Sequence, residues 1–443
     1  MCGCIVQRRL VRAHAARLLA LTLAGSGVLV PDSASAIERG YADPDLVLRP
    51  TWLRSNTSED EHGSVVSTRV RELRRAVDRT TVYWHPRRSV ERRGWVAEDT
   101  VFVVEDEVSG AGCATSWAKV RGGGYVCLDG TEPTDADRPR LPAAHPNRSL
   151  PFLYAARAGA PAFSYAFTES ARDESGREVL VRPGGRALDA ASYEVHASSR
   201  FRGRDLRLDP VPEGMLPAWT YVDDAPVHSI PSATSQPIGT LRKHTAVTIV
   251  AEPADANGHW FRIPDALGPG RPGFVDGRTS IRRWVPAAPI PDVEPSEIWL
   301  DIDLEQQVLA VRRGEDVIYA TLVSTGIPSR ATPTGIYRIR DKRAWSSMGS
   351  RPTSEDRYFV EKVPWTMYFR DHYAIHGAYW HDVFGQTRSH GCINLAPHDA
   401  AYVYRVVTPR SEPSFMWTYA SDRAPGSTVR IRKKQASGRD FRD

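Results

Sequence analysis

The most reactive pattern in this sequence is a cysteine close to two histidines. Cys392 follows Ser389, His390 and Gly391, and His376 stands sixteen residues before it. A thiol with an ordinary pKa of about 8.5 is a weak nucleophile at neutral pH, so a catalytic cysteine needs an imidazole to accept its proton. Gly391 leaves the backbone uncrowded, so N–H groups there could face a developing oxyanion. The pattern predicts a cysteine nucleophile with a histidine to accept its proton and backbone N–H groups for an oxyanion.

The residues around this cysteine predict antiparallel strands and one helix that would position it. Apolar and polar residues alternate from Ile298 to Asp303, and apolar runs at 308–311 and 317–323 flank a turn at Arg313-Gly314. Beyond the cysteine, apolar residues spaced by three and four positions follow Pro397, which predicts an amphipathic helix beginning there. The positive end of that helix would help to stabilise a Cys392 thiolate.

Four motifs resemble, in type and order, those of the L,D-transpeptidase catalytic domain of the YkuD type. They are Ser324-Thr325-Gly326, Thr332-Pro333-Thr334-Gly335, His376-Gly377 and Ser389-His390-Gly391-Cys392-Ile393-Asn394. The resemblance covers about Ile298 to Pro409 and implies that Cys392 forms a thioester with a peptidoglycan stem peptide. It also implies that His376 is the general base, oriented by a carbonyl at Gly377. The oxyanion donors would be Gly391 and Cys392.

The resemblance further implies a substrate pocket that His390 helps to shape. The residues expected to bind substrate are Ser389, Asn394, Tyr379, Trp380 and Thr334. Tyr379, Trp380 and His381 make an aromatic insert that we expect to line the donor groove. The donor would be a tetrapeptide stem that loses its terminal D-Ala, and transfer to an amine of a second stem would make a 3→3 cross-link. Because the thioester keeps the bond energy, no cofactor and no metal is expected.

Other interpretations of the same residues stay open. With water as the acceptor, the protein would be an L,D-carboxypeptidase, and a protein amine or a free D-amino acid could also accept the acyl group. The thiol and the imidazoles could be structural, or the protein could bind the cell wall without catalysis. A zinc site would need nitrogen and sulfur ligands. The candidates, whose spacing fits no standard zinc pattern, are His372, His376, His381, His390 and Cys392.

Length and composition predict several domains that are rich in short strands. The chain has 443 residues, about three times the usual domain length of roughly 150. Its 33 glycines and 33 prolines interrupt the chain too often for long helices to dominate. The net charge of +5, from 58 basic and 53 acidic side chains, gives no sign of nucleic-acid binding.

The first 36 residues have the pattern of a cleaved secretory signal peptide. Four arginines precede the apolar run from Leu18 to Val30, and Ala34-Ser35-Ala36 is an A-x-A cleavage site. About 13 apolar residues are too few to span a bilayer, so no membrane span is expected after cleavage. We therefore expect export, with the mature chain beginning near Ile37 and residing in the periplasm or the cell wall.

Export would leave three cysteines, because Cys2 and Cys4 lie in the predicted signal. Cys113 and Cys127 flank a glycine-rich turn between two strand-like stretches, which suits a disulfide across a hairpin in an oxidising compartment. Two separate buried thiols are the alternative. In either case Cys392 is the cysteine left without a partner.

A strand-rich pattern occurs twice before the catalytic region, at an offset close to 145 residues. Its strands and glycine turns include Trp117 in the first copy and Trp260 in the second. The pattern resembles bacterial SH3-like modules, which implies docking on peptidoglycan, and the alternative is that both tryptophans only fill barrel cores. No predicted catalytic residue precedes Pro295, so we expect these modules to act on localisation more than on chemistry.

Two proline-rich stretches, at 133–151 and 286–295, divide the chain. The predicted parts are a signal peptide (1–36), a first SH3-like module with an N-terminal extension (37–132), a linker with a possible degenerate β module (133–215), a second SH3-like module (216–285), a proline-rich linker (286–296), the catalytic domain (297–432) and a basic polar tail (433–443). The predicted fold class is mostly β: small SH3-like β-barrels, then a β-sandwich-like L,D-transpeptidase domain with one or more short helices. The predicted partners are peptidoglycan stem peptides, and the oligomeric state stays open.

Overall fold

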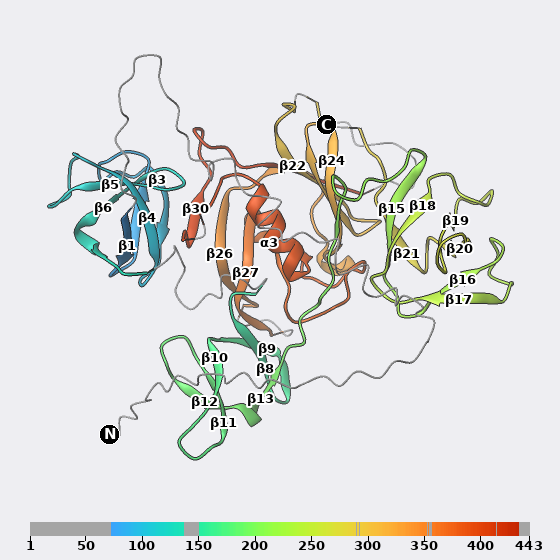
Figure 1. The fold of residues 1–443 in the computed structure, drawn as a ribbon, viewed down its shortest axis with the longest axis horizontal. Helices are drawn as coiled ribbons and strands as arrows, with labels where there is room; N and C mark the ends of the chain where they lie inside the picture. Colours follow the sequence, from blue (N-terminus) through green and yellow to red (C-terminus); the bar gives the residue numbers. More distant parts are fainter. Residues whose placement is uncertain are drawn as a thin grey trace, which may run out of the picture. The chain divides into compact units, whose positions relative to one another are not determined.

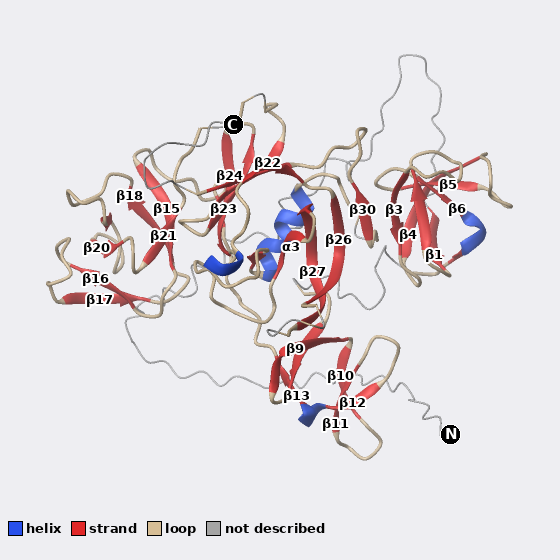
Figure 2. Cartoon of the chain, turned by 180° about the vertical axis from the view of Figure 1, so that it is seen from behind, coloured by secondary structure: helices blue, strands red, loops and turns tan. Residues whose placement is uncertain are grey.

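The computed structural model describes residues 72–136, 150–288, 290–291, 293–351, 353, 357–412 and 414–433. All of them belong to one compact unit, residues 66–443. The predicted signal peptide, with Cys2 and Cys4, and the tail beyond Lys433 lie outside the described residues. Strands dominate each described part of the chain (Figures 1 and 2), which confirms the mostly-β fold class. Over these same ranges, no helix combines the length and the apolar character needed to cross a bilayer.

Seven strands form the first module. They are β1 (Glu72–Ala76), β2 (Thr80–Tyr83), β3 (Arg92–Val96), β4 (Val101–Val108), β5 (Trp117–Val120), β6 (Tyr125–Cys127) and β7 (Thr131–Pro133). All pairings are antiparallel: β1 with β4 and β7, β2 with β3 and β6, and β5 with β4 and β6. Trp117 is fully buried. Cys113 and Cys127 form a disulfide with their Cα atoms 5.6 Å apart.

Seven further strands repeat this order between residues 215 and 283. They are β15 (Met215–Thr220), β16 (Ala225–His228), β17 (Pro237–Leu241), β18 (Ala246–Val250), β19 (Trp260–Ile263), β20 (Gly273–Asp276) and β21 (Ile281–Arg283). β15 pairs with β18 and β21, β16 with β17 and β20, and β19 with β20, as the corresponding strands of the first module do. Trp260 is buried like Trp117. Both tryptophans therefore lie in the interior, as the core interpretation expects.

A middle segment separates the two copies. Its strands are β8 (Leu153–Arg157), β9 (Ala160–Phe167), β10 (Glu169–Arg172), β11 (Glu178–Val181), β12 (Ala187–Asp189), β13 (Tyr193–Val195) and the short β14 (Arg204–Asp205). β8 pairs with β9 and β13, and β11 pairs with β10 and β12. Phe167 and Leu180 join the two groups of strands in one buried cluster.

Ten strands form the C-terminal part. They are β22 (Ile298–Asp303), β23 (Val308–Arg313), β24 (Asp316–Ser324), β25 (Gly335–Arg338), β26 (Asp341–Gly349), β27 (Phe359–Arg370), β28 (Tyr373–Gly377), β29 (Ile393–Leu395), β30 (Trp417–Tyr419) and β31 (Thr428–Arg432). Two sheets share β24. The first runs β14, β24, β23, β22, β31, β25. The second runs β24, β29, β28, β27, β26, β30.

One α-helix in the described part of the chain covers the second sheet (Figure 2). α3 (Pro397–Val406) begins at the predicted proline and packs on β27 and β28. Ala400 and Val403 are fully buried, as their spacing predicts. At its other end, the buried Lys342 amino group donates to the Val407 carbonyl (3.0 Å), and burial lowers the pKa of this lysine well below its usual value. The helix thus begins five residues after Cys392.

The N-terminal parts contact the C-terminal part through strand pairing. β9 runs parallel to the start of β27, with Phe163 opposite Phe359. β3 pairs with β30, with Trp95 opposite Trp417. The segment before β30 also places Phe415 in the core of the first module. Strands from different parts therefore extend the second sheet at two places.

Candidate active site

The parallel pairing of β28 with β29 brings Cys392 back to His376. In this ladder His376 lies opposite Asn394. Cys392 immediately precedes β29, so it lies beside the strand that carries the histidine although sixteen residues separate them in the sequence. A backbone hydrogen bond from Ala374, on the same strand, reaches the Cys392 thiol. The predicted nucleophile and the predicted base thus lie on neighbouring strands.

Gly391 forms a tight turn that only glycine accommodates. Its φ is +116°, and a Cβ atom there would lie 2.5 Å from Cε1 of Tyr373. Thr332 holds this turn: its hydroxyl donates to the Gly391 carbonyl (2.9 Å) and accepts the Gly326 N–H (2.9 Å). Thr334 is exposed and does not line the pocket around Cys392, so its role in substrate binding stays a prediction. Thr332 is the threonine of this motif that contacts the Gly391 turn.

Ser389 holds the other side of the turn. Its hydroxyl donates to the Cys392 carbonyl (2.5 Å) and accepts the Gly391 N–H (3.1 Å). The Gly391 N–H is therefore already engaged, which argues against its predicted role as an oxyanion donor. The Cys392 N–H has no partner among the residues that the structure describes, so it is the remaining candidate donor.

His376 is buried and held by a neighbouring carbonyl. Its side chain is 2% exposed, and Nδ1 lies 3.3 Å from the Gly377 carbonyl oxygen. With Nδ1–H donating to that carbonyl, Nε2 carries a lone pair and can accept a proton. Burial lowers the pKa of His376 to about 4, although the Gly377 hydrogen bond opposes this shift. His376 is therefore a neutral imidazole at pH 7, the form a general base requires.

Cys392 is a neutral thiol before substrate binds. Its side chain is partly exposed in the pocket, and burial raises the pKa of the thiol to about 11 despite the hydrogen bond from Ala374. A raised thiol pKa and a lowered imidazole pKa both favour the neutral pair over a thiolate–imidazolium pair. Both shifts thus describe a resting thiol and imidazole without charge.

Asn394 is oriented by His381. His381 Nδ1 accepts the Val383 N–H (3.3 Å), so its Nε2 carries the proton and needs an acceptor. The Asn394 amide lies 3.0 Å from Nε2, and its Oδ1 has no partner when the amide nitrogen faces His381. Turning the amide places Oδ1 on His381 and leaves the NH₂ group for the pocket. Asn394 then offers a substrate two N–H donors.

A pocket of about 630 Å³ contains the predicted residues. From the C-terminal part it is lined by Met348, Tyr358, Val360, His376, Trp380, Arg388, Ser389, His390, Cys392 and Asn394. His390 is exposed and stacks on Tyr358, with ring centroids 4.8 Å apart. Burial raises the pKa of Tyr358, and the nearby Cys392 adds to this shift. His390 and Tyr358 thus form an aromatic rim beside the thiol.

The aromatic insert divides between the pocket and the core. Trp380 lines the pocket, with its ring 5.8 Å from that of His376. Tyr379 is fully buried instead: it stacks on Tyr154 at 3.7 Å, and its hydroxyl donates to the Glu361 carbonyl (2.9 Å). The prediction that Tyr379 lines the donor groove is therefore wrong. The side chain faces a partner more than 200 residues away in the sequence.

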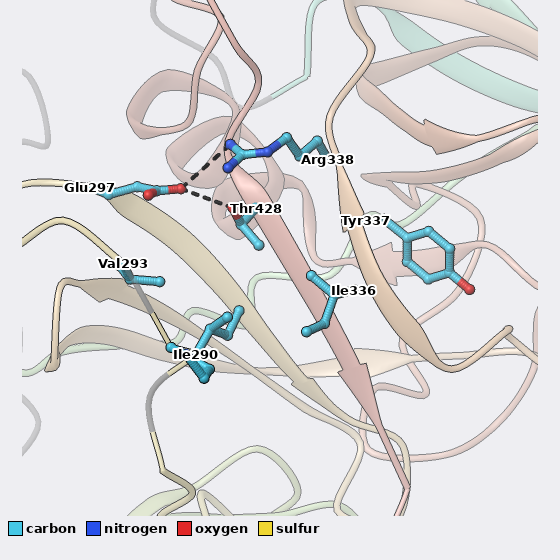
Figure 3. A pocket seen from close by; sticks show the side chains of 8 residues that line it. Ile290, Val293, Glu297, Ile336, Tyr337, Arg338 and Thr428 are labelled. Carbon is cyan, nitrogen blue, oxygen red and sulfur yellow. Dashed lines mark hydrogen bonds and ion pairs between the residues drawn. The ribbon is translucent and has the colours of Figure 1, made fainter. Parts of the chain in front are cut away.

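A second, smaller hollow lies away from these residues. Its volume is about 290 Å³, and Figure 3 shows Ile290, Val293 and Ile336 around it. An ion pair between Glu297 and Arg338 (3.7 Å) borders it. None of the predicted catalytic or substrate-binding residues lines this hollow.

Metal ligands are not gathered around Cys392 within the described ranges. Among the described residues, the side chains that come close enough to share an ion are in the first module: Cys113, Cys127 and Asp129. Its two sulfur atoms are joined in the disulfide, so they cannot serve as thiolate ligands.

Residues 297–431 match the family of L,D-transpeptidase catalytic domains called YkuD. L,D-transpeptidase 1 of Mycobacterium tuberculosis is 31% identical over 118 residues, which are 24% of this chain and 45% of that protein. The Bacillus subtilis protein YciB, whose name assigns it provisionally to the L,D-transpeptidases, is 27% identical over 127 residues, 26% of this chain and 63% of that protein. The matches span less than two thirds of either relative. The family match at residues 297–431 identifies this part of the chain as an L,D-transpeptidase catalytic domain.

Solved structures of the same kind also align with the chain. An L,D-transpeptidase from Mycobacterium smegmatis has 17% identity and a TM-score of 0.26, and the alignment covers 42% of this chain and 90% of that one. The catalytic domain of an Enterococcus faecium L,D-transpeptidase has 21% identity and a TM-score of 0.25, and covers 31% of this chain and 98% of that one.

Sequence reasoning missed the side of the pocket that the middle segment supplies. These lining residues are Ala156, Pro161, Ala162, Ser164, Glu194, Val195, His196 and Ala197. They belong to no motif, and contacts distant in the sequence, including the pairing of β9 with β27, bring them to the site. Part of the segment predicted as a linker with a possible degenerate β module (133–215) therefore lines the pocket.

Proposed function

We propose that this protein is an exported peptidoglycan L,D-transpeptidase that forms a thioester at Cys392 and passes the acyl group to an amine, making 3→3 cross-links. The observation that supports this best is the position of Cys392 beside His376, in one pocket of a domain from this family. The predicted signal peptide would direct export. The predicted SH3-like modules would hold the enzyme at the cell wall.

In the acylation step, the Cys392 sulfur attacks the carbonyl carbon that follows the L-centre of the diamino acid in a tetrapeptide stem. The thiol proton moves to Nε2 of His376 as the C–S bond forms. The Cys392 N–H, unpaired among the described residues, would stabilise the oxyanion. The C–N bond then breaks, and His376 gives its proton to the leaving amine of D-Ala. A thioester remains.

In the transfer step, an amine nitrogen attacks the thioester carbonyl. His376 accepts a proton from that nitrogen, the C–S bond breaks, and the proton passes to the departing sulfur. The product is an amide between two stems, and the enzyme returns to its neutral resting pair. Water in place of the amine would give a tripeptide and an L,D-carboxypeptidase activity.

Mass spectrometry with a synthetic tetrapeptide stem tests the proposal. The wild-type protein should gain the donor mass minus D-Ala on the peptide that carries Cys392. Cys392→Ala and Cys392→Ser should lose this adduct and the turnover, because the thiolate alone forms the thioester. Thr387→Ala is a matched control, since Thr387 is exposed near the site but does not line the pocket. Turnover above a few per cent in Cys392→Ala would refute the covalent mechanism, and tripeptide without cross-linked product would favour the carboxypeptidase.

A further inference from the structure

The middle segment supplies one whole side of the pocket that holds Cys392. Eight of the lining residues come from β8, β9, β13 and their flanks, including Ser164, Glu194 and His196. The first module and the second copy of its pattern contribute no lining residue among those that the structure describes. A substrate bound at Cys392 therefore contacts the middle segment as well as the catalytic domain.

This side of the pocket is fixed to the catalytic domain by several independent contacts. Ser164 on β9 lies opposite Val360 on β27 in the parallel ladder. Tyr154 stacks on Tyr379, three residues after the base His376, and its hydroxyl donates to the Lys362 carbonyl (2.7 Å). Such stacked pairs add about 0.5–1.5 kcal/mol beyond the area they bury. The segment is thus held in one position relative to His376.

Ser164 and His196 form the rigid centre of this side. Ser164 is fully buried, and its hydroxyl lies 2.9 Å from Nε2 of His196. The backbone N–H of His196 donates to the Tyr154 carbonyl (2.9 Å), and the His196 ring packs near Tyr379. Burial lowers the pKa of His196, although the neighbouring Glu194 opposes the shift. The imidazole is therefore neutral, and Glu194 is the charged group on this side.

Glu194 is a carboxylate at the pocket without an ion-pair partner in the described part of the chain. It lies on β13 opposite Ala156. The other permanently charged lining residue is Arg388, which belongs to the catalytic domain. Surface glutamates usually face bulk water, but Glu194 lines the same pocket as the nucleophile and the base. A cationic group that enters from this side meets the negative charge of the exposed Glu194 carboxylate.

We propose that Glu194 recruits the acyl acceptor by binding its ammonium group. The inference rests on the proposed function, in which an amine attacks the Cys392 thioester. An amine is protonated at neutral pH, so a carboxylate raises its local concentration next to the thioester. The ammonium first releases one proton to solvent. The nitrogen then attacks, the C–S bond breaks, and a second proton passes through His376 to sulfur. Glu194 thereby favours amines over water as acceptors.

The test compares the full chain with Glu194→Gln, using a tetrapeptide stem as donor and a tripeptide stem with a free side-chain amine as acceptor. In Glu194→Gln we expect the KM for the acceptor to rise about twofold to fivefold, the usual size of an exposed charge interaction. Thioester formation and hydrolysis without acceptor should stay unchanged. The difference should shrink in 0.5 M NaCl, because salt screens exposed charges. Glu194→Asp should keep most of the wild-type affinity.

Glu169→Gln is the matched control, because Glu169 is an exposed glutamate on β10 of the same segment and does not line the pocket. Equal acceptor KM values in wild type, Glu194→Gln and Glu169→Gln would overturn the proposal while leaving the transpeptidase function intact. Slower thioester formation in Glu194→Gln would also overturn it, by assigning the residue to the donor. If the wild-type chain forms no thioester at all, the proposed function itself fails, and this result is separate from any effect of Glu194.

Discussion

The neutral resting state of Cys392 predicts that its thiol is alkylated slowly at pH 7. Burial raises the pKa of the Cys392 thiol to about 11, compared with about 8.5–9 for an exposed thiol. At pH 7 an ordinary thiol of this kind is about 1% thiolate, and Cys392 is about 0.01% thiolate. Since only the thiolate reacts with iodoacetamide, we expect alkylation about 100-fold slower than for an unperturbed thiol. The rate should rise about tenfold per pH unit from pH 7 to pH 10.

The assay follows alkylation of the folded chain across this pH range by quantifying the peptide that contains Cys392. The same peptide in denatured protein gives the unperturbed reference. Partial burial of the sulfur slows the reaction at every pH equally, so the slope with pH reports the ionisation. His376→Ala should leave this slope unchanged, because a neutral His376 does not hold a thiolate in the resting state. A rate that levels off below pH 8 would refute this reasoning, because it would show a preformed thiolate–imidazolium pair.

Three further variants test the base, the rim histidine and a buried acid in helix α3. His376→Ala should slow thioester formation by about 10²–10⁴-fold, the usual contribution of a general base. His390→Ala should slow thioester formation by a smaller factor. Normal single-turnover acylation by His376→Ala would mean that the base is misassigned. Burial raises the pKa of Asp399 to about 6, although the Tyr319 hydroxyl and the Gly203 N–H donate to its carboxyl. The native state therefore binds this proton more tightly than the unfolded chain. As a result, the folded protein loses stability as pH rises from about 4 to 6. Relative to wild type, Asp399→Asn should gain roughly 2 kcal/mol in unfolding free energy between pH 4 and pH 7, and an equal difference at both pH values would contradict this.

Local patterns predicted the parts of the fold that depend on neighbouring residues. The alternation before Asp303 and the spacing after Pro397 are properties of single strands and helices, and both elements form where predicted. The order of motifs also predicted that Cys392 and His376 work together. The parallel ladder between β28 and β29 gives the physical reason, because it returns the chain to the strand that carries the base.

Contacts distant in the sequence decided where the predictions failed. An aromatic residue beside a motif can line a groove or pack in a core, and Tyr379 packs because Tyr154 covers it. Glu194 and Ser164 carry no spacing signal, since their relation to Cys392 depends on contacts distant in the sequence, such as the β9–β27 ladder and the stacking of Tyr154 on Tyr379. Thr332 and Thr334 are two residues apart in the same motif. Only the hydrogen bond to the Gly391 turn distinguishes them.

The middle segment limits how far wall docking and catalysis can be separated. A fragment that begins near Val293 would lose one side of the pocket, and it would leave Val360 and Tyr379 without Tyr154, which completes their cluster. Exposing one large apolar side chain costs about 1.5–3 kcal/mol, so such a fragment would lose stability as well as substrate contacts. The first module contributes no residue to the described pocket lining, so the argument does not extend to it. Residues 150–200 therefore belong with the catalytic domain, and a docking role is better sought in the two repeated modules.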